Sequence, residues 1–328
     1  MKKRMWKLGL ILMVSCAILA LTVIIGCDNG EDEDPVKLPA LLAHYALTKD
    51  LKDSVSNYAL YLTNLREDNG EVPDPLYVEL KDYAPGKQAL FFSGGSGWFA
   101  PCGAAQGLFH ANGDKVEHLE TFTMAAWVKV YDELFESGGA IFGSGGMGYD
   151  DVGALLTLIA DGEDKFLALD VGWEIWSPEI TSVNGGEYGQ AFVPIPKNVN
   201  WNQWVHFAVT YNHTTNIVTF YLNGELLGTD RYKREDINPD ELEAFTGPNF
   251  SQSGSLMRIH VGADMNYWLE NGGKLEMFNN LTATLVIGAR QDWGPIGNIF
   301  EGWIQDCRLY AEVLTAKQIK VVKDIVTP

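Results

Sequence analysis

The fold is decided by residues 201–228, which read WNQWVHFAVTYNHTTNIVTFYLNGELLG. Over residues 205–211 apolar side chains occupy every second position, the period of two that is typical of a half-buried β-strand: Val205, Phe207, Val209 and Tyr211. Residues 217–222 show the same alternation and predict a second strand. The pair Asn223-Gly224 then favours a two-residue turn with positive backbone angles, so residues 225–229 should return as the partner strand of a hairpin. The stretch predicts antiparallel β architecture.

The same alternation predicts further strands along the chain. They are expected at residues 45–47, 89–92, 122–130, 155–160, 166–171, 283–289 and 300–310. Residues 172–200 and 230–282 interrupt the pattern and are expected to be insertions. A capping box from Thr315 to Gln318 predicts a short C-terminal helix that packs across the edge of the sandwich. No strands alternate with long amphipathic helices, which argues against a parallel α/β sheet.

The composition fits one large β domain. Hydrophobic residues make up 46% of the chain and aromatic residues 12%, enough for a sizeable core, and the 34 glycines suit many tight turns. We place this domain at residues 41–322, followed by a tail at residues 323–328. The formal net charge of −19 repels nucleic acid and anionic lipid headgroups, so neither is expected as a partner.

The first 26 residues have the pattern of a lipoprotein signal peptide. A basic start, MKKRMWK, precedes an apolar run at residues 8–25, and the sequence IIGC at residues 24–27 resembles the bacterial lipobox. We therefore expect Cys27 to be lipidated, with Cys16 a weaker candidate because it would shorten the apolar run. The alternative is an uncleaved membrane anchor, for which the run just suffices.

Residues 27–40 contain the acidic run DNGEDEDP, which predicts a solvated tether. Acidic residues directly behind a lipidated cysteine also resemble the surface-export signal of some Gram-negative lipoproteins. The expected location is the bacterial cell envelope, lipid-anchored at the outer membrane or cell surface.

Six motifs, taken in order, resemble one known family. They are HYALTKDLKDSVSN, PGKQALFFSG, FTMAAWVKV, WNQWVHFAVTYN with FYLNGELLG, LVIGA, and FEGWIQDCRLYAEVLTAKQI. In this order they resemble the laminin-G-like, concanavalin-A-like jelly-roll domains of bacterial surface proteins, over most of residues 41–322. The resemblance implies an all-β, two-sheet antiparallel jelly-roll sandwich. It does not imply one function, because this fold serves lectins, adhesive modules and glycoside hydrolases alike.

The resemblance also suggests a calcium site. Residues 53–57, DSVSN, are similar to a family loop that often holds calcium together with an acid from the closing strand. Asp53, Asn57 and Asp306 would be the ligands. Two observations weigh against calcium: Gln305 stands where the family commonly has an acid, and Asp and Asn are frequent in plain turns.

Two cysteines, Cys102 and Cys307, remain in the exported chain. Disulfides persist in such a compartment, so one bond between them is an option. The other option is two buried free thiols that act as small hydrophobic residues.

The sequence shows no catalytic motif, so we expect no enzyme activity. The E-x-D-x-x-E strand of hydrolytic relatives is absent, as are a G-x-S-x-G elbow and metal-ligand spacing among the six histidines. A glycoside hydrolase with carboxylates from separate strands remains a third alternative.

Ten tryptophans favour sugar binding, because an indole offers an apolar face to a pyranose ring and an N–H to a hydroxyl. Trp176, Trp268 and Trp293 fall in expected loops, and we predict that they bind a polysaccharide with Tyr267, Asp264 and Asp292. Trp127 and Trp204 instead lie on strands, at positions that point to solvent. The alternative is that the loop tryptophans fold back over the core.

The sequence thus predicts a membrane-anchored lipoprotein with a non-catalytic carbohydrate-binding domain. Its rival is an adhesive or scaffolding module that binds another surface protein, for which the sandwich would present an apolar or charged patch.

Overall fold

The computed structural model describes residues 35–65, 77–93, 102–108, 121–130, 139–145, 153–161, 163–173, 187–212, 215, 217–231, 284–288, 290–291, 296–297 and 300–328. The described strands and the helix belong to the larger of two units, residues 38–328. Every pairing between the described strands of the larger unit is antiparallel, so the predicted all-β jelly-roll sandwich is confirmed. Among the described residues, no helix has the length and apolar character needed to cross a membrane.

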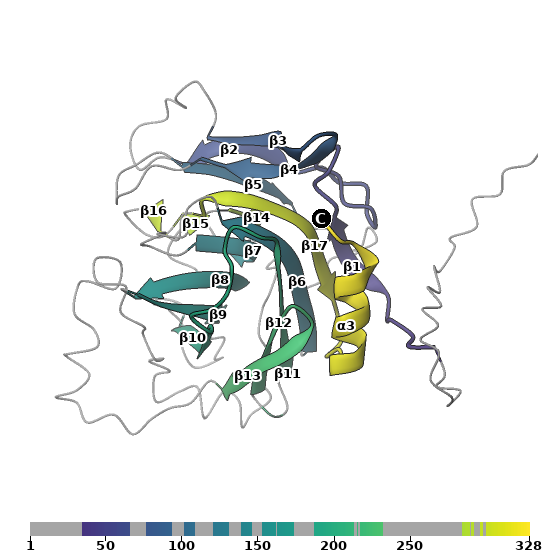
Figure 1. Cartoon of the computed structure of the whole chain (residues 1–328), viewed down its shortest axis with the longest axis vertical. Helices are drawn as coiled ribbons and strands as arrows, with labels where there is room; N and C mark the ends of the chain where they lie inside the picture. The colour runs from purple at the N-terminus through teal and green to yellow at the C-terminus, as the bar shows by residue number, and fades with distance from the viewer. Residues whose placement is uncertain are drawn as a thin grey trace, which may run out of the picture. The chain divides into compact units, whose positions relative to one another are not determined.

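The first sheet has the order β13-β12-β11-β6-β17-β4-β3, and β1 pairs with the second half of β17 (Figure 1). Its strands are β1 (Leu41–Tyr45), β3 (Val78–Ala84), β4 (Lys87–Phe92), β6 (Thr121–Val130), β11 (Val205–Asn212), β12 (Ile217–Leu222), β13 (Glu225–Arg231) and β17 (Gly302–Tyr310).

The second sheet has the order β10-β9-β8-β7-β14-β5-β2. Its strands are β2 (Tyr61–Leu65), β5 (Cys102–Leu108), β7 (Gly139–Gly145), β8 (Gly153–Asp161), β9 (Asp164–Trp173), β10 (Glu187–Pro194) and β14 (Thr284–Ile287). A small ribbon pairs β15 (Arg290–Gln291) with β16 (Ile296–Gly297). Where the sheet edges meet, the Phe192 amide on β10 donates to the Asp230 carboxylate on β13 at 3.1 Å.

The predicted hairpin at Asn223-Gly224 is confirmed. Both residues have positive φ, 51° and 83°, as a primed two-residue turn requires. The Asn223 side chain also accepts a hydrogen bond from the His206 amide at 3.0 Å, which fixes the turn to the start of β11.

Residues 172–200 are not the plain insertion that the sequence suggested. Residues 187–194 form β10, which pairs with β9 from Glu187 opposite Trp173 to Pro194 opposite Phe166. The sequence EYGQAFVP hides this strand because its glycine, glutamine and proline obscure the alternation. Of residues 230–282, the first two complete β13 and the rest lie outside the described residues.

The main core lies between the two sheets. Large side chains from each sheet are fully buried there, among them Phe122, Phe207 and Phe220 from the first sheet and Phe142 and Leu169 from the second. Burying each such side chain stabilises the fold by roughly 1.5–3 kcal/mol. The core therefore holds the sheets at a fixed spacing, and it leaves their outer faces available for other contacts.

The predicted C-terminal helix is present as α3 (Ala316–Ile325), and the capping box between Thr315 and Gln318 is confirmed. Its packing differs from the expectation, because α3 covers part of the outer face of the first sheet rather than an edge. Ile319 and Val322 bury against Ala125 and Ala208, which lie opposite each other on β6 and β11. These alanines have short side chains, so the helix can approach the sheet closely. Figure 1 shows α3 beside the end of β17.

Gly288, directly after β14, provides a test of the packing between the two sheets, because it lies against Phe92 of β4. Its φ of 93° is unfavourable for other residues, and an added Cβ would clash with the Phe92 ring. Gly86 in the β3–β4 turn has a similar φ of 72° but open space around it. We expect Gly86→Ala to cost about 1 kcal/mol for backbone strain, and Gly288→Ala to cost about 1–3 kcal/mol more through overpacking. Urea unfolding of both variants would check this, and equal losses would contradict the tight contact across the core.

Candidate functional site

A β-bulge at Asp306 interrupts the closing strand β17. Gln305 lies opposite Trp127 on β6, but the next pair is Arg308 opposite Ala125, so two residues of β17 face one residue of β6. Asp306 takes the left-handed conformation with φ 54°, which aspartate tolerates better than most residues. The bulge shifts the alternation by one position: Cys307 joins the core between the sheets, and Arg308 falls on the outer side.

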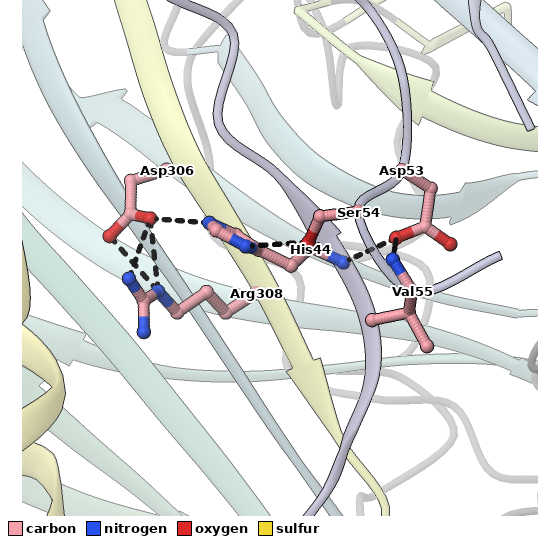
Figure 2. A network of polar contacts seen from close by, with 6 residues as sticks. All are labelled: His44, Asp53, Ser54, Val55, Asp306 and Arg308. Atoms are coloured by element: carbon pink, nitrogen blue, oxygen red, sulfur yellow. Dashed lines mark hydrogen bonds and ion pairs between the residues drawn. The ribbon is translucent and has the colours of Figure 1, made fainter. Parts of the chain in front are cut away.

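The bulge places the Asp306 carboxylate between two basic side chains (Figure 2). Arg308 donates from Nε to both carboxylate oxygens at 3.0 Å, and its Nη2 lies 2.9 Å from Oδ1. On the other side, His44 Nε2 lies 2.8 Å from Oδ1. Asp306 and Arg308 are almost fully buried. Burial would lower the pKa of Arg308, but Asp306 and Tyr310 together outweigh burial and the pKa is raised, so Arg308 and Asp306 form a buried ion pair.

His44 extends the network to the loop after β1. Its Nδ1 lies 2.9 Å from Ser54 Oγ, and its backbone amide donates to Asp53 Oδ1 at 2.8 Å. Figure 2 shows Asp306, His44 and Ser54 in line, with Asp53 beyond them. The network thus joins β17, β1 and the loop at residues 53–57.

Asp53 organises this loop from within. Oδ1 also accepts from the Val55 amide at 3.0 Å, while Oδ2 accepts from the Ser56 amide at 3.0 Å and from the Ser56 hydroxyl. The loop closes when the Asn57 amide donates to the Asp53 carbonyl at 2.8 Å, with Asn57 at φ 64°. The buried carboxylate therefore serves as the acceptor that fixes the turn.

These side chains, as arranged, do not fit a calcium ion. Calcium needs several oxygen ligands free to point at one centre, whereas both Asp53 oxygens already accept protein hydrogen bonds. Asp306 is neutralised by Arg308, and Asn57 is exposed. Within the part of the chain that the structure describes, no three His, Cys, Asp or Glu side chains form a group suited to a metal. Calcium binding through Asp53, Asn57 and Asp306 stays an untested prediction, which this geometry does not favour.

The line Ser54–His44–Asp306 resembles a nucleophile, base and orienting acid in its order. Two features argue against hydrolysis. The carboxylate is shared with Arg308, which offsets the negative charge that would stabilise an imidazolium. The amides of residues 54, 55 and 56 donate to His44 O, Asp53 Oδ1 and Asp53 Oδ2, so they cannot serve as oxyanion donors. The arrangement therefore has a structural role, which is to hold β17, β1 and the loop at residues 53–57 together.

A second feature lies on the outer face of the first sheet, on the part that α3 leaves free. Five aromatic side chains gather there, and we call them the aromatic face: Tyr83, Phe91, Trp127, Trp204 and Trp303. Trp303 pairs in register with Phe91 on one side and Lys129 on the other. The Phe91 and Trp303 rings lie 4.6 Å apart. Trp127 and Phe91 are nearly buried, while Tyr83, Trp204 and Trp303 are partly exposed.

One contact shows that the sheet curls toward this face. The Tyr83 and Trp204 ring centroids are 4.9 Å apart, although β4, β17 and β6 lie between β3 and β11 in the sheet order. With strands about 4.8 Å apart, a flat sheet would separate β3 from β11 by about 19 Å. The contact between the two rings therefore indicates that the sheet curves across the aromatic face.

Unpaired polar atoms lie beneath the aromatic rings. Trp127 stands between His206 and Gln305 in the strand register, and all three are buried. Four of these atoms have no hydrogen-bond partner within the part of the chain that the structure describes: Trp127 Nε1, His206 Nδ1, Gln305 Oε1 and Trp204 Nε1. Burial, only partly opposed by Asp306, lowers the pKa of His206 from 6.5 to about 3, so its imidazole is neutral at physiological pH.

The sugar-binding residues predicted from the loops cannot be placed. Trp176, Trp268, Trp293, Tyr267, Asp264 and Asp292 lie outside the described residues, as does Cys27. Sequence reasoning passed over Trp303 and did not choose Trp127 or Trp204 as binding residues. The signal that could have found them is an indole at the solvent-facing position of a strand, where a polar residue is usual.

Cys307 is a free, fully buried thiol. Burial and the neighbouring Asp306 raise the pKa of this thiol well above its usual value. Of the two options for Cys102 and Cys307, the disulfide is therefore not formed in the structure. The physical reason is that the bulge turns Cys307 into the apolar core, where its side chain packs as a small hydrophobic residue.

Comparison with known proteins confirms the resemblance. Residues 103–255 match the family model described as the concanavalin A-like lectin/glucanases superfamily. No curated protein matches the sequence.

Among solved structures, the chain is similar to one from a study of how cell entry of botulinum neurotoxin type C depends on two ganglioside molecules. The two chains are 16% identical with a TM-score of 0.48, and the match covers 87% of this chain and 51% of the toxin chain. Domain 4 of AbnA, an arabinanase from Geobacillus stearothermophilus in complex with arabinotriose, has 16% identity and a TM-score of 0.44, covering 86% and 98%. A SAP-like pentraxin from Limulus polyphemus has 16% identity and a TM-score of 0.36, covering 63% and 71%. The chain thus spans about half the length of the toxin chain.

We expect Asp306→Asn to destabilise the domain. Asparagine also tolerates positive φ, so the variant mainly removes the charge and leaves Arg308 buried without its partner, at a cost of about 3–5 kcal/mol. The control is Asp164→Asn, which breaks an exposed ion pair with Lys197 and should change the stability far less. Urea unfolding at pH 7 measures both. A similar loss of unfolding free energy in the two variants would show that the Asp306 network does not hold these elements together.

Proposed function

We propose that this chain, a jelly-roll protein whose residues 103–255 match the concanavalin A-like lectin/glucanases superfamily, binds carbohydrate on its aromatic face and performs no catalysis. The observation that carries the proposal is the gathering of three indoles, Trp127, Trp204 and Trp303, on one face of a curled sheet. An outward sheet face is normally polar. Partly exposed indoles there suit the C–H faces of pyranose rings.

The polar atoms of the face support the same proposal. Trp127 Nε1 and Trp204 Nε1 can donate, and Gln305 Oε1 can accept, yet none of the three atoms has a hydrogen-bond partner among the described residues. A buried polar atom without a partner costs about 1–3 kcal/mol. Sugar hydroxyls both donate and accept, so a sugar that reached between the rings would recover part of that cost.

The charges near the face support a role without catalysis. Retaining glycoside hydrolysis uses two carboxyl groups about 5 Å apart that flank the sugar bond. Among the described residues of this face, Glu79 lies 3.5 Å from Lys81, and Asp306 is held by Arg308. The buried Asp306 carboxylate lacks the free position that an acid or nucleophile needs, and the exposed Glu79 has no second free carboxylate beside it among the described residues of the face.

We expect Trp303→Ala to weaken glycan binding about tenfold or more, because losing a stacked aromatic side chain forfeits about 1.5–3 kcal/mol and each 1.4 kcal/mol is a factor of ten. The measurement is calorimetric titration of the full chain in detergent with a panel of plant, algal and host polysaccharides. Tyr61→Ala is the matched control, since it removes an exposed aromatic side chain from the second sheet.

Trp268→Ala belongs in the same series, because it tests the loop residues predicted from the sequence. Loss of binding in Trp268→Ala alone would move the site to the loops. Absence of binding across the whole panel would overturn the carbohydrate proposal and favour adhesion to another surface protein. Melting curves of each variant would separate lost binding from lost folding.

The proposal also includes a lipid anchor at Cys27, supported by the IIGC motif and the acidic residues that follow it. Such an anchor would hold the domain at the bacterial outer membrane or cell surface. We expect Cys27→Ser to abolish labelling with fatty acid and to leave the precursor uncleaved. Persistent labelling would contradict this assignment unless a Cys16→Ser change removes it.

A further inference from the structure

Lys129 occupies an unusual position on the aromatic face. Its Nζ lies 5.4 Å from the centre of the Trp303 ring, with which it pairs in register. On its other side, Val205 pairs with Val128, so Trp204, the residue before Val205, lies beside Lys129. Lys129 therefore lies between the positions of two tryptophans in the sheet, and its side chain is partly buried.

Lys129 is partly buried and has no acidic partner within the described residues, whereas other lysines without such a partner, for example Lys87, are exposed. Lys81 pairs with Glu79, Lys197 with Asp164 and Lys320 with Glu225. The buried carboxylate on the same strand pair, Asp306, is already neutralised by Arg308. The chain has a formal net charge of −19, so acidic side chains are plentiful, and yet this partly buried cation has none beside it within the described residues. Its ammonium group is therefore available to bind an acidic group of a ligand.

The hydrogen-bonding groups around Lys129 favour an acceptor. Lysine and the indole nitrogen donate and never accept, and carboxylate and sulfate groups accept and never donate. Trp127 Nε1, on the same strand two residues before Lys129, and Trp204 Nε1, directly before β11, are donors without partners among the described residues. An anionic group can accept from all three donors at once, whereas a neutral hydroxyl also donates a proton and is better matched beside the acceptor Gln305 Oε1.

We propose that Lys129, with Trp204 and Trp303, binds the acidic group of an anionic polysaccharide, a carboxylate or a sulfate on the sugar that stacks on the aromatic face. This inference rests on the proposed function and specifies its ligand class. The acidic surface elsewhere does not prevent such binding, because charges more than about 8 Å apart are largely screened at physiological ionic strength.

The test compares ligands that differ only in charge. Calorimetric titration of the full chain in detergent uses oligogalacturonate against its methyl ester, and dextran sulfate against dextran. We expect one charged form to bind about tenfold tighter than its neutral counterpart, which is the value of one hydrogen bond between charged groups. The preferred pair identifies the group as carboxylate or sulfate.

Three variants test whether Lys129 causes the preference for the charged ligand. Lys129→Met keeps the unbranched stem and should bind the charged and neutral forms equally, while Lys129→Arg keeps the charge and the preference. Lys87→Met removes an exposed lysine from β4 of the same sheet and should leave the preference intact. Equal binding of charged and neutral forms by the unaltered chain, or a preference that survives Lys129→Met, would overturn the inference and leave carbohydrate binding in place. Binding of none of these ligands or of the wider panel would overturn both.

Discussion

The buried ion pair between Asp306 and Arg308 is the interaction on which the rest of the structure depends. Removing these two charges from water is costly, and the cost is met only because Asp306 also contacts His44 and both partners are held in fixed geometry. To reach this position Asp306 adopts a positive φ and creates the bulge in β17. One carboxylate therefore fixes the central strand, the first strand and the loop that Asp53 organises.

The bulge also decides what each face of β17 presents. Because the alternation shifts by one position, Cys307 and Leu309 enter the core between the sheets, and Tyr310 joins the cluster beneath α3. Before the bulge, Trp303 and Gln305 face outward among the aromatic residues. The outer face of one sheet is thus divided into a part closed by a helix and a part lined by aromatic rings. Side-chain size explains the division, because Ala125 and Ala208 admit the helix and Trp127 does not.

The aromatic face combines three properties that rarely occur together on a solvent-facing sheet: partly exposed indoles, buried polar atoms without partners and a lysine without an acid. Each is unfavourable for an isolated domain. Together they are complementary to a ring with apolar faces and charged or hydroxyl substituents. The curl of the sheet brings Tyr83 and Trp204 together across the face, so residues distant in sheet order contribute to one surface.

The sequence by itself determined the fold class, the hairpin at Asn223 and Gly224, and the capping box of α3, because alternation, turn chemistry and caps are local properties. It also pointed to Asp53 and Asp306 as special, but it assigned them to calcium. Only the tertiary structure brought His44 and Arg308 to Asp306, since a single bulge in β17 changes which residues share a face and no local pattern announces it. The strand β10 and the aromatic face were likewise decided by pairing between distant strands. Trp303, Lys129 and Trp204 become neighbours through strand register, which depends on the whole sheet.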